Sequence, residues 1–108
     1  MPESDFLLFV FAARRFPLGT LVATPNALAT IPPQDTSVAL SRHANGDWGE
    51  LDSEDRKAND RALEDGGRLF SAYYSTERIK FYIITEWDRS VTNVELHISH
   101  EMLTLQKC

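Results

Sequence analysis

Cysteine is almost absent from this 108-residue chain, because Cys108 is the single cysteine and the last residue of the sequence. No disulfide can form within the chain, and neither a thiolate zinc site nor a cysteine nucleophile has support. A cysteine content this low is typical of a reducing compartment, so we expect a cytoplasmic protein. The sequence also lacks internal repeats and low-complexity segments, and its length favours a single domain.

Long hydrophobic runs are absent too. The apolar run at residues 6–13 has eight residues, far fewer than the roughly 20 that span a bilayer. Glu3 and Asp5 precede this run, where a secretory signal carries basic residues. We therefore expect no membrane association. We interpret residues 1–15 as an N-terminal extension that forms a strand or a short helix, and residues 16–108 as the domain.

Basic charge is scarce in one stretch of the chain, and this stretch accounts for the whole net charge of −5. Between residues 47 and 65 there are eight acidic residues, opposed by Arg56, Lys57 and Arg61, which leaves −5. The remaining residues hold eight acidic and eight basic groups and are neutral. Surfaces that bind nucleic-acid phosphates carry the opposite sign, so direct nucleic-acid binding is disfavoured.

The pattern of apolar residues predicts an α+β domain. Alternating apolar positions indicate strands at residues 16–24, 68–74, 79–86 and 91–98. Helical spacing and capping residues indicate a helix between Thr24 and Pro32, a second at residues 35–43, a third starting at Asp52-Ser53 and ending at Gly66-Gly67, and a last turn at 99–103. We expect a mostly antiparallel sheet, built from the N-terminal strand and a C-terminal three-stranded meander, with two or three helices on one face.

Several short motifs follow one order and spacing. They are Pro17-Leu18-Gly19 with Val22-Ala23-Thr24-Pro25, Arg42-His43 with Gly46-Asp47-Trp48-Gly49, Asp55 with Asn59, and Ile83-Ile84-Thr85-Glu86 with Asp88-Arg89-Ser90. In these motifs the chain resembles an uncharacterised family of small bacterial proteins found on plasmids and other mobile elements. Members are often labelled "plasmid-related protein" or type I restriction subunit. The resemblance implies a role on mobile DNA, and it provides no catalytic residue that could be assigned to a position of this chain. A restriction methyltransferase subunit needs a larger cofactor-binding domain than this chain holds, so we reject that label.

The first candidate site is the group Arg42, His43, Asp47 and Trp48. A guanidinium, an imidazole, a carboxylate and an indole in seven residues can together bind an anion or a base ring. The alternative is structural, in which Arg42 and Asp47 pair locally while Trp48 fills the edge of the core.

The second candidate site is Glu86, Asp88 and Arg89, at the end of a predicted strand. Paired carboxylates can do acid–base chemistry or hold a hard cation. The alternative is a hydrogen-bonded turn with solvated charges. His97, His100 and Glu101 supply too few converging ligands for zinc, so we predict no metal site and no cofactor.

The predicted third helix carries five carboxylates that we call the acidic face: Asp52, Glu54, Asp55, Asp60 and Glu64. Such a charge run is either a solvated helix surface or a docking surface for a basic protein partner. We predict a small non-enzymatic binding protein, an anti-defence or regulatory factor that docks a protein partner through this face. An edge strand of the meander also offers a route to a homodimer.

The alternative class is a small hydrolase that uses His43, Asp47, Glu86 and Asp88. Such an enzyme requires these side chains, with Arg42, to converge in one concave pocket. A binding module requires an exposed patch or ridge instead. The arrangement of these residues in space therefore distinguishes the two classes.

Overall fold

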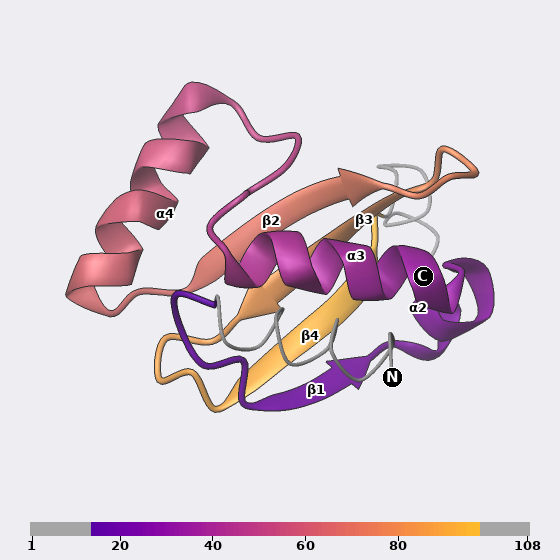
Figure 1. Cartoon of the computed structure of the whole chain (residues 1–108), viewed down its shortest axis with the longest axis horizontal. Helices are drawn as coiled ribbons and strands as arrows, with labels where there is room; N and C mark the ends of the chain where they lie inside the picture. Colours follow the sequence, from indigo (N-terminus) through magenta and orange to yellow (C-terminus); the bar gives the residue numbers. More distant parts are fainter. Residues whose placement is uncertain (1–13, 98–108) are drawn as a thin grey trace, which may run out of the picture.

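Seven elements follow one another in the computed structural model, which describes residues 14–97 (Figure 1). They are β1 (Thr20–Ala23), α2 (Pro25–Thr30), α3 (Pro33–Ala44), α4 (Ser53–Asp65), β2 (Leu69–Tyr74), β3 (Lys80–Thr85) and β4 (Val91–Leu96). The predicted N-terminal extension lies almost entirely outside the described residues, and so does the predicted turn at 99–103.

The strands form one sheet in the order β1-β4-β3-β2. The chain from β2 to β4 is an antiparallel meander, and β1 pairs in parallel with β4. The predicted α+β class is confirmed, and the sheet is mixed because of the parallel β1–β4 pair. The strand β1 comes from the first part of the chain, and three helices separate it from the meander, which is a connection long enough to allow a parallel pair.

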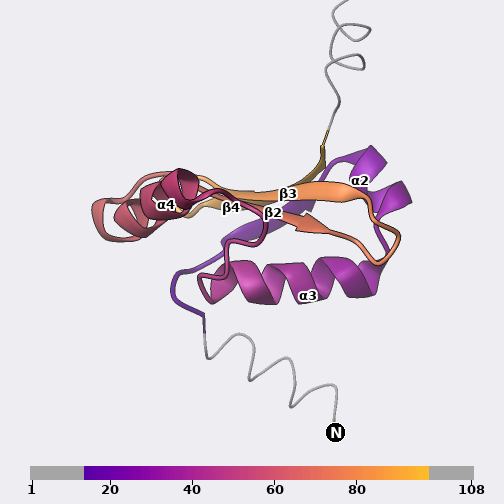
Figure 2. The same cartoon turned by 90° about the horizontal axis from the view of Figure 1, so that it is seen from above.

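The helices occupy three different places around the sheet. Figure 2 shows α3 lying flat against one face, whereas α4 stands level with the sheet beside its β2 end. The expectation of helices gathered on one face therefore holds for α3 and not for α4. The reason is the polarity of α4: its one buried residue is Asn59, and only Ala62 and Leu63 pack with the core from this helix. A helix with so little apolar surface cannot cover a sheet face.

Helix ends follow the sequence signals closely. Thr24 caps α2 by accepting a hydrogen bond from the Ala27 amide, with Pro25 in the first turn, as predicted. The cap of α4 is Asp52, whose side chain accepts from the Asp55 amide at 2.8 Å, and Ser53 is the first helical residue. Gly66 ends α4 in the left-handed conformation at φ 85°, which glycine adopts without steric cost.

The core has two parts along α3. Under the N-terminal part of α3, and beside α2, buried residues form the first cluster: Ala27, Ile31, Ala39, Tyr73, Phe81, Ile83 and Val94. Towards the end of α3 the second cluster contains Phe16, Leu18, Ala44, Trp48 and Leu69. The segment between α3 and α4 therefore runs over the end of the sheet and supplies Trp48 to the core.

The outer edge of β2 is closed by contacts from α4 and from the segment before it. The Asn59 side-chain amide donates to the Phe70 carbonyl at 2.6 Å and accepts from the Phe70 N–H at 3.1 Å, as a neighbouring strand would. Two residues along, the Ala72 N–H donates to the Trp48 carbonyl and the Ala72 carbonyl accepts from the Glu50 N–H. Both outward-facing residues in the middle of β2 thus have their hydrogen bonds satisfied.

Gly49 makes this close approach possible. It lies at φ 74°, and a Cβ placed there would come within 2.0 Å of the Ala72 carbonyl oxygen. Only glycine therefore fits between Trp48 and Glu50 at this position.

We expect Asn59→Ala to lower the free energy of unfolding by about 2 kcal/mol, because two backbone groups of Phe70 lose their partner. Urea denaturation followed by circular dichroism measures this change. Lys57→Ala, an exposed substitution on the same helix, is the matched control and should shift stability by less than about 0.5 kcal/mol. Equal stabilities for the two variants would show that Asn59 does not seal the strand.

Candidate functional site

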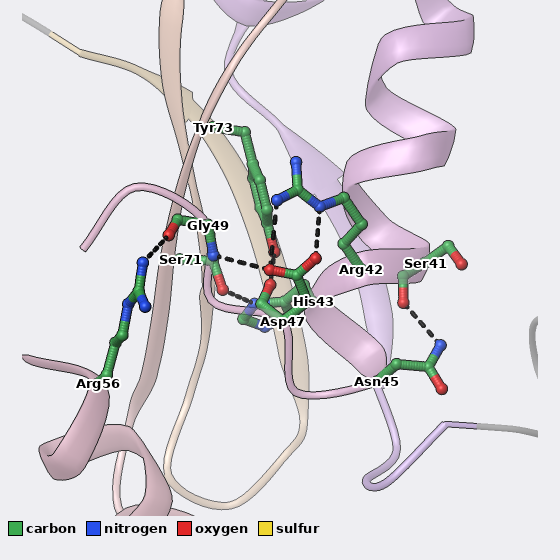
Figure 3. Close-up of polar contacts among 9 residues, drawn as sticks. All are labelled: Ser41, Arg42, His43, Asn45, Asp47, Gly49, Arg56, Ser71 and Tyr73. Carbon is green, nitrogen blue, oxygen red and sulfur yellow. Dashed lines mark hydrogen bonds and ion pairs between the residues drawn. The ribbon is translucent and has the colours of Figure 1, made fainter. Parts of the chain in front are cut away.

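Two adjacent residues of α3, Arg42 and His43, lie in opposite environments (Figure 3). Arg42 is exposed at the surface, whereas the His43 side chain is completely buried, with 0% of its surface accessible. This separation follows from the helix itself, because consecutive residues point about 100° apart. Arg42 and His43, which the sequence placed in one candidate binding site, therefore belong to two separate groups of contacts, one at the surface and one in the core.

His43 is the middle of a buried hydrogen-bond chain. Its Nδ1 lies 2.5 Å from Ser71 Oγ on β2, and its Nε2 lies 2.9 Å from Thr85 Oγ1 on β3. Thr85 Oγ1 in turn lies 2.7 Å from Thr92 Oγ1 on β4, which donates to the Leu18 carbonyl at 2.7 Å.

The direction of each bond in this chain follows from its last member. The Thr92 hydroxyl donates its single proton to the Leu18 carbonyl, so it accepts a hydrogen bond from Thr85. Because the Thr85 hydroxyl donates to Thr92, it must accept from His43 Nε2–H. Nδ1 is therefore unprotonated and accepts from the Ser71 hydroxyl. The geometry assigns His43 the neutral Nε2–H tautomer.

Electrostatics hold His43 in this neutral form. Burial lowers its pKa to about 3, and the positive charge of Arg89 acts in the same direction. An imidazole with this pKa is a poor proton acceptor at neutral pH. The predicted role of His43 as a binding or catalytic group is therefore replaced by a structural one.

Arg42 and Asp47 form a bidentate ion pair at the surface. Arg42 Nε lies 2.7 Å from Asp47 Oδ2, and its Nη2 lies 3.2 Å from Oδ1. The pair raises the pKa of Arg42 and lowers that of Asp47 through their mutual hydrogen bonds. The guanidinium also stacks 4.8 Å from the centre of the Tyr73 ring, while the Tyr73 hydroxyl donates to the Asp47 carbonyl. This is the local pairing that the structural alternative predicted.

Trp48 also has the structural role given above as the alternative, because its side chain fills the edge of the core. Only 5% of its surface is exposed, and its ring stacks on Phe16 at 6.3 Å and meets the edge of His43 at 5.7 Å. Its indole N–H donates to Asp60 on α4 at 3.1 Å. The indole therefore links α4 to the core and offers no free face for a base ring.

The second candidate group is a turn whose side chains are mostly engaged. Glu86 forms an ion pair with Arg68 at 3.0 Å. Asp88 accepts from the Ser90 amide, and hydrogen bonds from Ser90 lower the Asp88 pKa. These contacts match the hydrogen-bonded turn that was the alternative to a carboxylate site.

Arg89 is the largest departure from the expected binding role. Its guanidinium donates to three backbone carbonyls, those of Ala62, Gly67 and Glu86. It also lies 5.7 Å from the centre of the Phe16 ring. The Ala62 carbonyl belongs to the last turn of α4 and the Gly67 carbonyl follows its C-cap, so Arg89 holds the end of that helix to the β3–β4 turn. Its backbone adopts φ 61°, a left-handed conformation that a residue with a side chain rarely takes.

The residues required by the hydrolase alternative do not converge. Arg42 stacks near the end of β2, Glu86 pairs with Arg68 before its start, and His43 is enclosed between α3 and the sheet. An open groove of about 440 Å³ lies between α3 and the end of β2. Arg42 lines this groove, whereas His43, Asp47, Glu86 and Asp88 do not.

The acidic face lies where the sequence placed it. Its five members are all exposed on α4 or at its cap: Asp52, Glu54, Asp55, Asp60 and Glu64. Two of them also have a local task, because Asp52 caps the helix and Asp60 accepts from the Trp48 indole. The ion pairs found among residues 14–97 join Arg42 to Asp47 and Arg68 to Glu86. Neither pair includes a carboxylate of the acidic face, so within these residues no arginine or lysine from outside α4 forms an ion pair with that face.

Sequence reasoning missed the polar partners inside the core. Ser71, Thr85 and Thr92 are each fully buried, at 0% exposure. The signal was present, because Thr85 and Thr92 occupy the apolar faces of their strands, where a hydroxyl needs a partner. A histidine on a neighbouring helix is such a partner. Sequence reasoning also missed the role of Asn59, whose side-chain amide binds the outer edge of β2.

No protein-family model, curated protein or solved structure matches this chain. The plasmid-family resemblance therefore stays a prediction. Among residues 14–97, no helix has the length and apolar character needed to cross a bilayer. In the same range, no three His, Cys, Asp or Glu side chains gather as a metal site would require. His100 and Glu101, considered above as ligands, lie outside the described residues.

We expect the stability of the protein to fall as the pH is lowered through 6.5, with a contribution of His43 that steepens from about 0.7 kcal/mol per pH unit at pH 6.5 to about 1.4 kcal/mol per pH unit near pH 5. Unfolded histidine takes up a proton near pH 6.5, whereas the folded pKa is about 3, so protons favour the unfolded chain in this window. Urea denaturation between pH 5 and 7, where carboxylates stay ionised, should show this slope in the native protein and lose it in His43→Gln.

The exposed histidine His97 provides the control, and His97→Gln should keep the slope. NMR of the folded native protein gives a second measurement that does not depend on the variant. The His43 ring should remain neutral down to pH 5, and a titration of this ring near pH 6.5 would contradict the buried neutral form.

We expect Arg89→Lys to lower the free energy of unfolding by about 2 kcal/mol although the charge is kept. One ammonium cannot reach the separated carbonyls of Ala62, Gly67 and Glu86 with the geometry of a guanidinium fork. Thermal and urea denaturation measure the loss. Arg61→Lys on the exposed side of α4 is the matched control, and a comparable effect of both substitutions would refute the fastening role of Arg89.

Proposed function

We propose that this chain is a small non-enzymatic binding protein that docks on a basic protein surface through α4. The observation that carries the proposal is the position of the acidic face, exposed on a helix that stands beside the sheet rather than against it (Figure 2). Because α4 is held only along its inner side, its outer side is available to a partner.

The charge of the segment supports a basic partner. Residues 52–65 contain six acidic and three basic side chains, which leaves −3. One of the basic residues, Arg56, donates to the Gly49 carbonyl and is turned towards the protein. A surface of this sign speeds encounter with a positively charged partner and repels nucleic-acid phosphates.

Part of this charge also has an intramolecular role. Asp52, Glu54 and Asp55 lie at the start of α4, where negative charge stabilises the positive helix end by about 0.5 kcal/mol each. Glu64, in the last turn, has the opposite effect on the helix. Its presence favours docking over helix stability alone as the reason for the acidic face.

The cellular setting that we propose is the cytoplasm of a bacterium that carries a plasmid or another mobile element. The single cysteine supports the compartment, and the sequence resemblance supports the mobile element. In that setting the chain acts as an anti-defence or regulatory factor. A basic surface of a host protein that handles nucleic acid is a suitable target, because such surfaces attract acidic helices.

A hydrolase is less well supported than a binding protein. The four side chains it would use are distributed over a buried hydrogen-bond chain, a surface ion pair and a turn. The exposed acidic helix is an arrangement expected of an interaction surface.

Neutralising α4 should weaken binding of the partner. We expect Glu54→Gln with Glu64→Gln, which keeps the caps and side-chain shapes, to weaken recovery of the partner from bacterial cells by about fivefold, since each lost charge contributes about 0.5 kcal/mol within a range of roughly 0.2–1 kcal/mol. Quantitative affinity purification with the full chain, repeated at rising salt, measures this loss.

Glu77→Gln with Glu95→Gln is the matched control, because it removes the same charge from the β2–β3 turn and from β4, away from α4. A protein that is lost with the α4 variant, kept with the control and released by salt supports the proposal. If every co-purifying protein is recovered equally with both variants, α4 is not the docking surface.

A further inference from the structure

The edge strand β1 lies at the opposite side of the sheet from α4, and no other strand among residues 14–97 pairs with its outer side. Its four residues, Thr20–Ala23, carry no charge, and the Leu21 and Val22 side chains are 47% and 43% exposed. In a strand these two consecutive side chains point to opposite faces. Both faces of β1 are therefore exposed at Leu21 and Val22, whereas Ala23, at the end of the strand, packs against the first core cluster.

The backbone of β1 has unsatisfied groups along its outer side. Thr20 N–H donates to Ser90 and Thr24 N–H donates to Val94, so the even-numbered residues of this segment bond inwards to β4. The N–H and C=O groups of Leu21 and Ala23 therefore point outwards. Among residues 14–97, no other strand or side chain binds these groups.

The two edges of the sheet contrast sharply. At β2, Asn59, Trp48 and Glu50 satisfy the outward-facing groups of Phe70 and Ala72. At β1 nothing comparable is found in the described part of the chain. An uncharged, apolar edge strand with free backbone groups is suited to pairing with another strand.

We propose that β1 pairs in antiparallel fashion with β1 of a second copy of this chain. A twofold axis beside Val22 places Leu21 opposite the partner copy's Ala23. These outward-facing residues then exchange four backbone hydrogen bonds, and the two Val22 side chains become neighbours on one face. The two sheets join into one continuous sheet.

The distribution of charge makes β1 the edge at which a second copy meets the least repulsion. Each chain carries −5, so most arrangements of two copies bring like charges together. Pairing at β1 avoids this, because α4 lies beyond β2 at the far edge of each sheet (Figure 1). The contact itself is made by uncharged residues on both sides.

The expected affinity is modest. A four-residue strand buries less surface than the roughly 1,200 Å² of a standard stable interface, so we expect a dissociation constant on the order of 100 μM. Sedimentation equilibrium of the full chain with reductant, up to about 1 mM, should show a reversible monomer–dimer equilibrium. Reductant removes any contribution of a Cys108 disulfide.

Charge at position 22 tests the location of the interface. Val22→Lys and Val22→Glu should each abolish the dimer, because they place like charges side by side across the twofold axis. An equimolar mixture of the two variants should restore dimers, since lysine then faces glutamate. Val38→Lys, with 49% exposure on α3, is the matched control and should dimerise as the native chain does.

Restoration by mixing also shows that both variants are folded, so loss of fold cannot imitate the result. A native chain that stays monomeric to about 1 mM overturns the proposal. So does self-association that is unchanged by either charge at position 22, which would indicate that another surface, or the residues before 14, holds the copies together. The α4 charge variants do not touch this edge, so this test is independent of the proposed docking function.

Discussion

The fold depends on one buried neutral histidine. His43 connects α3 to β2 and β3, and through two threonine hydroxyls the connection continues to β4 and to the segment before β1. Thr85 and Thr92 each donate one hydrogen bond and accept one, whereas His43 donates through Nε2–H and accepts at Nδ1 from Ser71, so a single proton arrangement satisfies them all. A buried polar chain of this kind specifies how the helix sits on the sheet, because a shifted helix would leave several groups unpaired.

This constraint explains why a sequence that looks like a binding site folds into a scaffold. The polar residues around Gly46-Asp47-Trp48-Gly49 bind each other, the sheet edge or α4, and Arg89 binds backbone carbonyls. The left-handed backbone of Arg89 fits the same explanation, since three hydrogen bonds offset the cost of an unusual φ. Within residues 14–97, the surfaces for which we propose recognition, the outer side of α4 and the outer edge of β1, are among those that these contacts leave exposed.

The sequence was informative where structure is decided locally. Thr24, Pro25 and Gly66 mark helix ends through bonds to residues within one turn, and strand alternation gave the meander. Partners distant in sequence were not predictable in this way. Nothing near His43 indicates that Ser71 and Thr85 will face it, and nothing near Asn59 indicates that its amide will bind β2. The parallel pairing of β1 with β4 is likewise decided by how three intervening helices pack.

The two edges of the sheet connect the fold to recognition. The hydrogen bonds between Asn59 and β2 require α4 to stand beside the sheet (Figure 2). The carboxylates of the acidic face are exposed to solvent on this helix. The same arrangement leaves β1 as the edge at which another strand can be added. A pair of chains joined at β1 would carry one acidic helix at each end of a continuous sheet. A partner with two basic surfaces at matching separation would then bind both helices, and the second contact would gain from the high local concentration set by the first.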